Sequence, residues 1–124
     1  MSKSAVTLID TSAWIEALRP KGNAKITEQV DALLQSGNAR FCEPVILELY
    51  NGAKGKNEIL KLREMVSAIP TLQTTEAIWK ESYASAISFR ERGLTIPNID
   101  ILIYQVAKHY KVGLLSVDAH FAMT

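Results

Sequence analysis

The 124-residue chain has the length of a single domain that can bury a sizeable hydrophobic core. Hydrophobic residues make up 48% and charged residues 22%, which is typical of a folded protein and excludes an extensively disordered chain. The formal net charge of +1 neither requires nor excludes a nucleic-acid partner, because phosphate binding depends on local clusters of Lys and Arg.

Cysteine and histidine usage limits the chemistry further. Cys42 is the only cysteine, which excludes an intramolecular disulfide, and with only two histidines a classical structural zinc site is excluded as well. No apolar signal region follows Met1, and no apolar run approaches the length of a membrane span. We therefore expect a protein of the reducing cytoplasm.

Strand-like and helix-like segments alternate along the chain. Four short runs have the apolar, β-branched character of strands: residues 6–9, 39–42, 69–73 and 114–117. Helical spacing of apolar residues, bounded by Gly or Pro, recurs in six segments: residues 13–18, 24–35, 44–50, 56–67, 75–93 and 100–111. Pro70 places the third strand at an edge. The alternation predicts one α/β domain over residues 1–124, with helices on both faces of a central parallel sheet of four or five short strands.

Asp10 directly follows the first predicted strand. In open α/β sheets the ligand crevice lies beyond the carboxyl ends of the strands, so a carboxylate at this position is a candidate functional group. The alternative is a structural cap at a strand-to-helix turn, a position that Thr11 or Ser12 also suits for a helix beginning near Ala13. Asp10 by itself does not separate these interpretations.

Glu48 is the only polar side chain in residues 45–50, whose apolar residues cover most of the circumference of a helix. We therefore expect the segment to be largely buried. An isolated buried carboxylate costs roughly several kcal/mol unless a cation or hydrogen bonds compensate, and a metal ion would do so. The alternative is that Glu48 points through a narrow gap to solvent.

Two further acids complete the candidate set. Asp100 opens an apolar helix, where favourable interaction with the helix N-terminus explains it equally well, and Asp118 follows the last predicted strand. We expect Asp10, Glu48, Asp100 and Asp118 to converge, since none has an obvious basic partner nearby in the sequence. Four anions together repel one another unless divalent cations bind, and an oxygen-only ligand set favours Mg²⁺ or Mn²⁺.

Four motifs, in order along the whole chain, resemble those of PIN-domain ribonucleases of the VapC toxin type. They are Ile-Asp-Thr-Ser-Ala-Trp at residues 9–14, Glu-Pro-Val-Ile-Leu-Glu-Leu at 43–49 with Gly52, Asp-Ile-Leu-Ile at 100–103, and Leu-Leu-Ser-Val-Asp-Ala-His-Phe at 114–121. One departure is Tyr104-Gln105, where the family usually has small residues, and we expect it to alter the packing beneath the site.

The resemblance implies a PIN-like three-layer fold and a metal-dependent endoribonuclease that hydrolyses RNA phosphodiester bonds. By this analogy one or two Mg²⁺ ions, with Mn²⁺ as a substitute, would be held directly or through water by Asp10, Glu48, Asp100 and Asp118. It also implies inhibition by a cognate antitoxin protein and, commonly, a homodimer.

Several other residues near these motifs have two interpretations. Supporting hydroxyls that would bind water or a phosphate oxygen, or else act as caps, are Thr11, Ser12 and Ser116. Small basic groups that could follow phosphates, but more often form a solvated face, are Arg19 with Lys21 and Lys25, Lys54 with Lys56, and Arg90 with Arg92. We interpret Trp14 as a core residue, His120 as a loop residue and His109 as a favourable cation at a helix end.

Three other classes of protein share some of these features. A signalling receiver domain fits poorly because Thr11-Ser12 follows Asp10 and no aspartate lies between Asp31 and Asp100. A haloacid-dehalogenase-type phosphatase is disfavoured because its second aspartate would fall at Ser12. A PIN-like module that binds RNA or protein without cleaving it remains the alternative, and the presence of all four acids argues against it.

Overall fold

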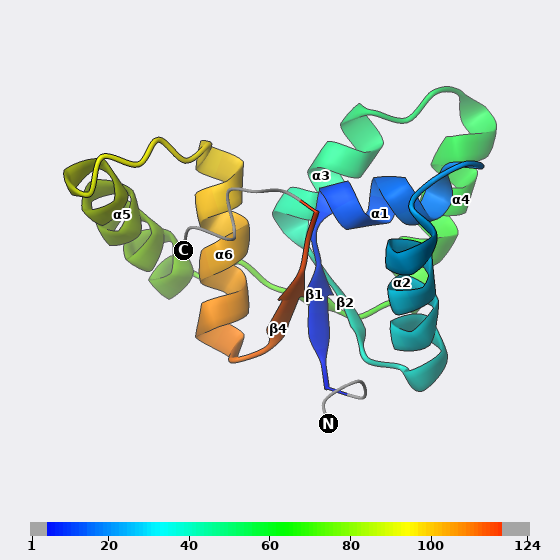
Figure 1. The fold of residues 1–124 in the computed structure, drawn as a ribbon, viewed down its shortest axis with the longest axis horizontal. Coiled ribbons are helices and arrows are strands. Elements are labelled where there is room, and N and C mark those ends of the chain that lie inside the picture. Colours follow the sequence, from blue (N-terminus) through cyan, green and yellow to red (C-terminus); the bar gives the residue numbers. More distant parts are fainter. Residues whose placement is uncertain (1–4, 118–124) are drawn as a thin grey trace.

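A four-stranded parallel sheet forms the centre of the protein, which is described by a computed structural model over residues 5–117 (Figure 1). Its strands are β1 (Thr7–Ile9), β2 (Ala39–Cys42), β3 (Thr71–Leu72) and β4 (Gly113–Leu115), arranged in the order β3-β2-β1-β4. The parallel sheet is confirmed, with four strands in the described range, and so is the edge position expected for the strand after Pro70. Asp118 lies outside the described residues.

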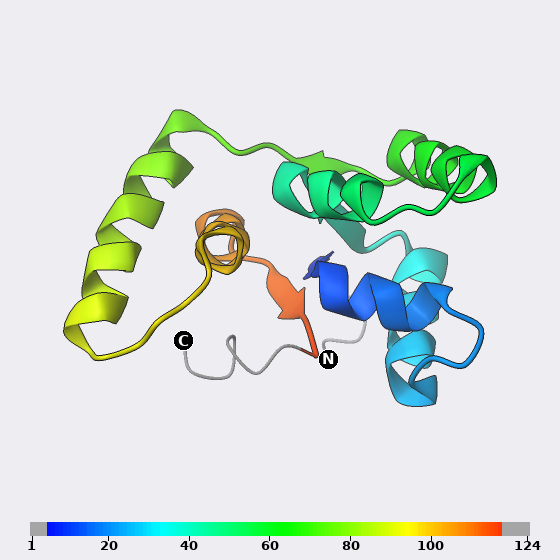
Figure 2. The same cartoon turned by 90° about the horizontal axis from the view of Figure 1, so that it is seen from above.

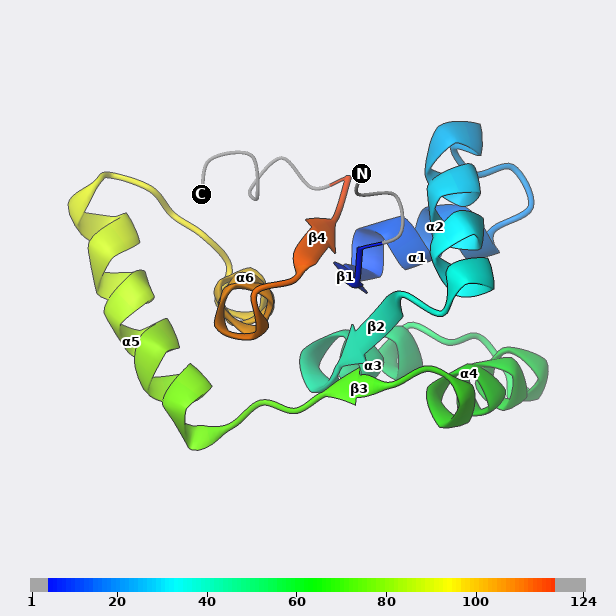
Figure 3. The same ribbon diagram turned by 90° about the horizontal axis from the view of Figure 1, so that it is seen from below.

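Six helices surround this sheet in residues 5–117. They are α1 (Thr11–Leu18), α2 (Ala24–Ser36), α3 (Glu43–Asn51), α4 (Lys56–Ala68), α5 (Glu76–Glu91) and α6 (Asn98–Tyr110). Figures 2 and 3 show α6, with α5 outside it, on one side of the sheet and α1 and α2 on the other. This is the three-layer α/β arrangement expected for a PIN-like fold. None of the described helices is both long and apolar enough to span a bilayer.

The strand register brings three chain segments to one edge of the sheet, by which we mean the end where the strands have their carboxyl ends. Thr7 pairs with Ala39 on one side and with Gly113 on the other, and all the strands run in the same direction. The carboxyl ends of β1, β2 and β4 therefore face the same way (Figure 1). Asp10 comes directly after β1 and Ser116 directly after β4, so the topology alone places both at this edge.

The core fixes α1 against the strands. Trp14 and Phe41 are fully buried, and their rings stack with centroids 5.0 Å apart. Leu8 and Ile9 of β1 are also fully buried beside them in the same cluster. The interpretation of Trp14 as a core residue is confirmed, because its ring has no exposed surface on which a base could stack.

Tyr104 and Gln105 contribute to the packing of α6 on α5. Gln105 is buried and its Oε1 accepts a hydrogen bond from the Ser85 hydroxyl at 2.7 Å. The Tyr104 ring lies 5.9 Å from that of Phe89. Residues 104–105 thus take part in the contact between α5 and α6, and an altered packing beneath the site stays a prediction.

Several element boundaries differ from the sequence prediction, and three of the elements concerned are α1, β4 and β3. α1 begins at Thr11 instead of near Ala13, with Asp10 as its N-cap, and β4 ends at Leu115 although the apolar run continues to Val117. β4 ends early because Ser116 and Val117 make hydrogen bonds to Asp10 and Ser12 in place of a continued ladder. α1 begins early because the Asp10 side chain accepts the Ser12 N–H and so caps the helix. β3 has two residues instead of the five predicted.

Replacing the core aromatic ring tests this packing. We expect Phe41→Ala to lower the free energy of unfolding by about 3–5 kcal/mol, because it leaves a cavity against the Trp14 ring. Urea denaturation followed by tryptophan fluorescence measures the change. Leu47→Ala is the control, since 64% of the Leu47 surface is exposed and its loss should cost less than about 0.5 kcal/mol. Equal losses in the two variants would contradict the assignment of the core.

Candidate functional site

The Asp10 carboxylate lies between β1 and α1, with only 3% of the residue exposed. Its Oδ2 accepts hydrogen bonds from the Ser12 hydroxyl at 2.6 Å and from the Ser116 hydroxyl at 2.9 Å. The backbone N–H of Ser12 also points to this oxygen, at 3.4 Å, which is the N-cap contact. Asp10 is therefore a helix cap and a buried anion at the edge of the sheet, so the two interpretations of this residue are compatible.

The hydroxyl groups of the two serines also lie close together. Their hydroxyl oxygens lie 3.1 Å apart, and the backbone N–H of Val117 donates to Ser12 Oγ at 3.2 Å. The backbone N–H of Asp10 donates to the carbonyl of Leu115 at 2.9 Å. The segment after β4 is thereby attached to the first turn of α1. Ser12 and Ser116, two of the three hydroxyl residues predicted to support the site, orient Asp10.

Glu48 is half-buried in α3, and its carboxylate is held by the third predicted hydroxyl. Thr11 Oγ1 donates to Glu48 Oε1 at 2.6 Å, which links Glu48 to the residue that follows Asp10. The expectation that residues 45–50 are largely buried is wrong at Leu47, which is 64% exposed. α3 packs on the core through Val45 and Leu49, so the opposite side of the helix faces solvent and Glu48 lies between the two.

The third acid lies on a helix whose first turn is at the same end of the molecule, and the fourth lies outside the described residues. Asp100 is half-buried in the first turn of α6, whose N-terminal end is at the top of Figure 1 with the carboxyl ends of the strands. Within residues 5–117, no three His, Cys, Asp or Glu side chains are grouped closely enough to hold a metal ion. The structure thus links Asp10 with Glu48, and convergence of all four acids stays a prediction.

The electrostatic field at this edge is negative. Burial raises the pKa of the Cys42 thiol to about 12, and the carboxylates of Asp10, Glu43 and Glu48 act in the same direction. In the part of the chain that the structure describes, neither Asp10 nor Glu48 forms an ion pair with a basic side chain. Cys42 therefore stays a neutral thiol, and no ion pair within the described residues offsets the charge of Asp10 or Glu48.

The donor set at this edge fits a hard divalent cation. Asp10 and Glu48 offer carboxylate oxygens, and the hydroxyls around them keep those carboxylates oriented. Such oxygen ligands are those that Mg²⁺ and Mn²⁺ prefer, whereas the neutral, buried Cys42 thiol is a poor ligand for a softer metal. The residues present thus suit the kind of metal ion that the sequence predicts.

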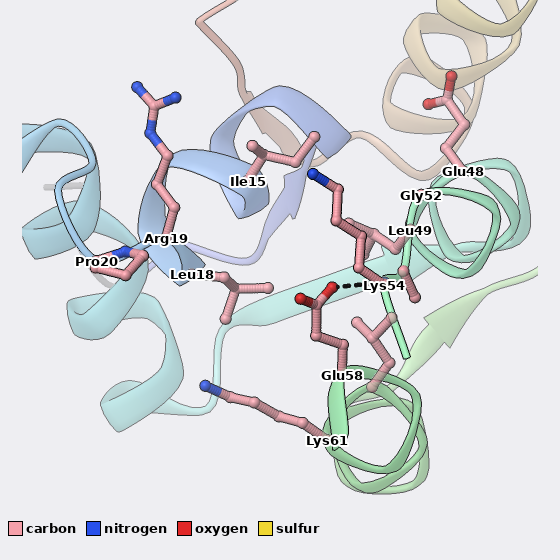
Figure 4. Close-up of a pocket in the computed structure, with 12 residues that line it drawn as sticks. Ile15, Leu18, Arg19, Pro20, Glu48, Leu49, Gly52, Lys54, Glu58 and Lys61 are labelled. Carbon is pink, nitrogen blue, oxygen red and sulfur yellow. Dashed lines mark hydrogen bonds between the residues drawn. The ribbon is translucent and has the colours of Figure 1, made fainter. Parts of the chain in front are cut away.

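A pocket of about 430 Å³ lies next to Glu48, and we refer to it as the Glu48 pocket (Figure 4). It lies between α1, α3, the loop after α3 and α4. Its apolar lining includes Ile15, Leu18, Leu49 and Leu62, and the basic side chains around it are Arg19, Lys54 and Lys61.

The structure shows which of the predicted basic residues lie near the candidate site. Arg19 and Lys54, which belong to two different predicted groups, line the same pocket, whereas Arg92 lies 5.7 Å from the Phe89 ring on α5. Sequence analysis missed Lys61 because nothing in its local pattern distinguishes it from other exposed lysines of a helix. His109 lies in the last turn of α6 as expected, 3.0 Å from Glu81, and His120 lies outside the described residues.

The model of the PIN domain family matches residues 7–124. The chain is 35% identical over 118 residues to ribonuclease VapC11 of Mycobacterium tuberculosis and to a VapC ribonuclease of Mycobacterium bovis. Each alignment covers 92% of this chain and 87% of the relative. The chain therefore belongs to the PIN-domain family and, within it, to the group of VapC ribonucleases.

Solved structures support the same fold. VapBC2 from Rickettsia felis, bound to a DNA fragment from its promoter, superposes with a TM-score of 0.79 at 19% identity, covering 94% of this chain and 91% of that one. VapC20 of Mycobacterium tuberculosis, described as a Sarcin-Ricin loop cleaving toxin, gives a TM-score of 0.71 at 18% identity, covering 94% and 93%. At these identities the likeness concerns the fold alone.

The reactivity of the Cys42 thiol tests whether this residue is buried close to the acids. Because its pKa is raised to about 12, we expect the thiol to be almost entirely protonated at pH 8 and unreactive toward a thiol-specific alkylating reagent. In denaturant the single thiol should react at the rate of an unperturbed cysteine. Mass spectrometry of labelled protein measures both rates, and fast labelling of the folded chain at pH 8 would contradict the structure.

Proposed function

We propose that this chain is a metal-dependent endoribonuclease that acts as the toxin of a toxin–antitoxin pair in the cytoplasm. The proposed site holds Mg²⁺, or Mn²⁺ as a substitute, through the carboxylates of Asp10, Glu48, Asp100 and Asp118. Membership of the VapC group supports the activity. The observation that carries the proposal is the buried Asp10 carboxylate, oriented by two hydroxyls and linked to Glu48 through Thr11.

The roles of the protein groups follow from their contacts. Ser12 and Ser116 keep Oδ2 of Asp10 in one orientation, and Thr11 does the same for Oε1 of Glu48. Such preorganisation avoids the cost of ordering the carboxylates when a substrate binds. When bound, a divalent cation would supply activation of the attacking water and neutralisation of charge on the phosphate and the leaving oxygen. It would also offset the repulsion between these acids and the RNA backbone.

Removing one carboxylate tests this proposal. We expect the wild-type chain to cleave a mixture of structured RNAs with Mg²⁺ or Mn²⁺ but not with EDTA. Asp10→Asn and Glu48→Gln should each lower the cleavage rate by at least about 100-fold, since each loses a charged oxygen ligand. Gel analysis of RNA treated with purified, antitoxin-free protein measures the rate, and circular dichroism checks the fold.

Asp31→Asn and Glu28→Gln are matched controls, because they make the same chemical changes at exposed positions of α2 away from the site. Both should cleave as the wild type does. Undiminished cleavage by Asp10→Asn and Glu48→Gln would refute the roles of these acids. Absence of metal-dependent cleavage by the wild type would favour the non-catalytic RNA- or protein-binding module.

We also propose that the protein forms a homodimer and binds a cognate antitoxin that inhibits it. Structural neighbours include complexes described as VapBC, from Haemophilus influenzae among others, which supports a partner of this kind. For the homodimer, a row of large apolar residues on α5 offers a surface. Trp79, Tyr83 and Ile87 are 46%, 61% and 61% exposed, spaced four residues apart on one side of the helix.

Introducing a charged side chain into this row of apolar residues tests whether it forms the dimer interface. We expect Tyr83→Glu to raise the dimer dissociation constant by at least about 10-fold, because it buries a carboxylate in an apolar contact. Ser88→Glu, also exposed on α5, adds the same charge outside the row and should leave the constant unchanged. Sedimentation equilibrium measures both constants. A wild-type chain that stays monomeric at every concentration would contradict the homodimer.

A further inference from the structure

We infer that two copies of this chain pair through antiparallel α5 helices, related by a two-fold axis at Tyr83. In this arrangement Glu76 of each copy forms an ion pair with the partner's Arg90. The inference rests on the homodimer proposed above, and it extends that proposal by naming the orientation of the two helices and the charges that select it.

The side of α5 that carries the apolar row, defined as Trp79, Tyr83 and Ile87, differs from the side that packs on the rest of the chain. Figures 2 and 3 show α6 between α5 and the sheet. Phe89 of α5 is buried in a cluster with Ile101 of α6. At 3.6 residues per turn, the apolar row projects from another side of the helix, and all three of its members are exposed.

The apolar row is symmetric about Tyr83. Trp79 lies four residues before Tyr83 and Ile87 four residues after it, and Tyr83 is also near the middle of α5. A two-fold axis at Tyr83 therefore places each Trp79 opposite the partner's Ile87. An interface between two identical copies requires this kind of self-complementarity, in which the same two positions meet twice.

The charges beyond the two ends of the row have the same symmetry. Glu76 lies seven residues before Tyr83, and Arg90 lies seven residues after it. Seven residues make nearly two helical turns, so both exposed side chains lie in line with the row. An antiparallel contact brings each Glu76 to the partner's Arg90, whereas a parallel contact in register would place like charges opposite each other.

Both charged groups are available for this contact. Within residues 5–117, Arg90 forms no ion pair, and Glu76 pairs with Lys80 at 3.2 Å. The Lys80 and Glu76 side chains are 72% and 84% exposed, and a pair so solvated contributes little. A guanidinium can donate two parallel hydrogen bonds to one carboxylate, which an ammonium group cannot do. The contact between copies therefore competes with the pair inside one chain.

A second copy fits this surface better than an unrelated protein segment does. A different partner would have no need for a row of apolar residues and charges that match themselves after a two-fold rotation. A second copy satisfies the row and both charges at once. The antiparallel arrangement also places the N-terminal end of each α5 beside the C-terminal end of the other, where the two helix dipoles attract.

Charge reversal tests the ion pair and the orientation together. Sedimentation equilibrium of the purified full chain at low salt measures the dimer Kd. We expect Glu76→Arg and Arg90→Glu each to raise Kd by at least about 10-fold, because each creates two repulsive contacts per dimer. The chain with both substitutions should return to within about 3-fold of the wild-type Kd, since the ion pairs form again with their charges exchanged. In a parallel dimer neither single substitution would weaken association.

Mixing the two single variants gives a second test of the same contact. In the mixed dimer the arginines of one chain face the glutamates of the other at both ends. We therefore expect the mixture to associate with nearly the wild-type Kd, although each variant alone dimerises weakly. Glu28→Arg and Arg63→Glu are matched controls at exposed positions of α2 and α4 and should change Kd by less than about 2-fold. Circular dichroism checks the fold of every variant.

Ionic strength tests the charged contact without any substitution. The wild-type Kd should rise between 50 mM and 500 mM salt by about 3-fold or more, because salt screens partly exposed charges. The chain with Glu76→Gln and Arg90→Gln should show a weaker salt dependence. A wild-type Kd that does not change with salt would contradict the ion pairs.

Unchanged Kd in both single variants, or no recovery in the doubly substituted chain, would overturn the inference. If Tyr83→Glu nevertheless separates the two copies, the homodimer proposed above stands and the antiparallel ion pairs alone are refuted. A wild-type chain that stays monomeric at every concentration overturns both. The cleavage assay judges the ribonuclease function separately in every case.

Discussion

The hydrogen bonds to Asp10 are the constraint on which the arrangement of the site depends. A carboxylate that is almost fully buried must be satisfied by donors, because an unpaired buried charge is strongly destabilising. Here the donors are Ser12 in the first turn of α1 and Ser116 after β4, two segments far apart in the sequence. The need to satisfy one anion therefore fixes how β1, α1 and the end of β4 meet.

The same edge combines two opposite electrostatic environments. Asp10, which follows β1, and the acids of α3 create a negative field that reaches as far as the buried thiol of Cys42. A few residues away, Lys54 and Lys61 line the Glu48 pocket, and neither forms an ion pair within the described residues.

The elements were predictable from the sequence to the extent that their signals are local. Alternating apolar runs and Gly or Pro breakers identified all four strands and all six helices of the described range, and Pro70 identified an edge strand. The errors occurred where tertiary contacts decide. β4 ends early because Ser116 bonds to Asp10, and Leu47 is exposed because only one side of α3 meets the core, which a uniformly apolar sequence does not indicate.

The sequence by itself determined the residue types of the site and their order. The signals for them are local in the sequence: the ends of strands, a lone glutamate in an apolar helix and the family motifs. Only the tertiary structure decided what those residues contact. Thr11 binds Glu48, two serines share one oxygen of Asp10, and Arg19, Lys54 and Lys61 line a single pocket. Apart from the contact between Asp10 and Ser12, these contacts join segments that are tens of positions apart. They are set by side-chain direction and packing, which leave no periodic signal in the sequence.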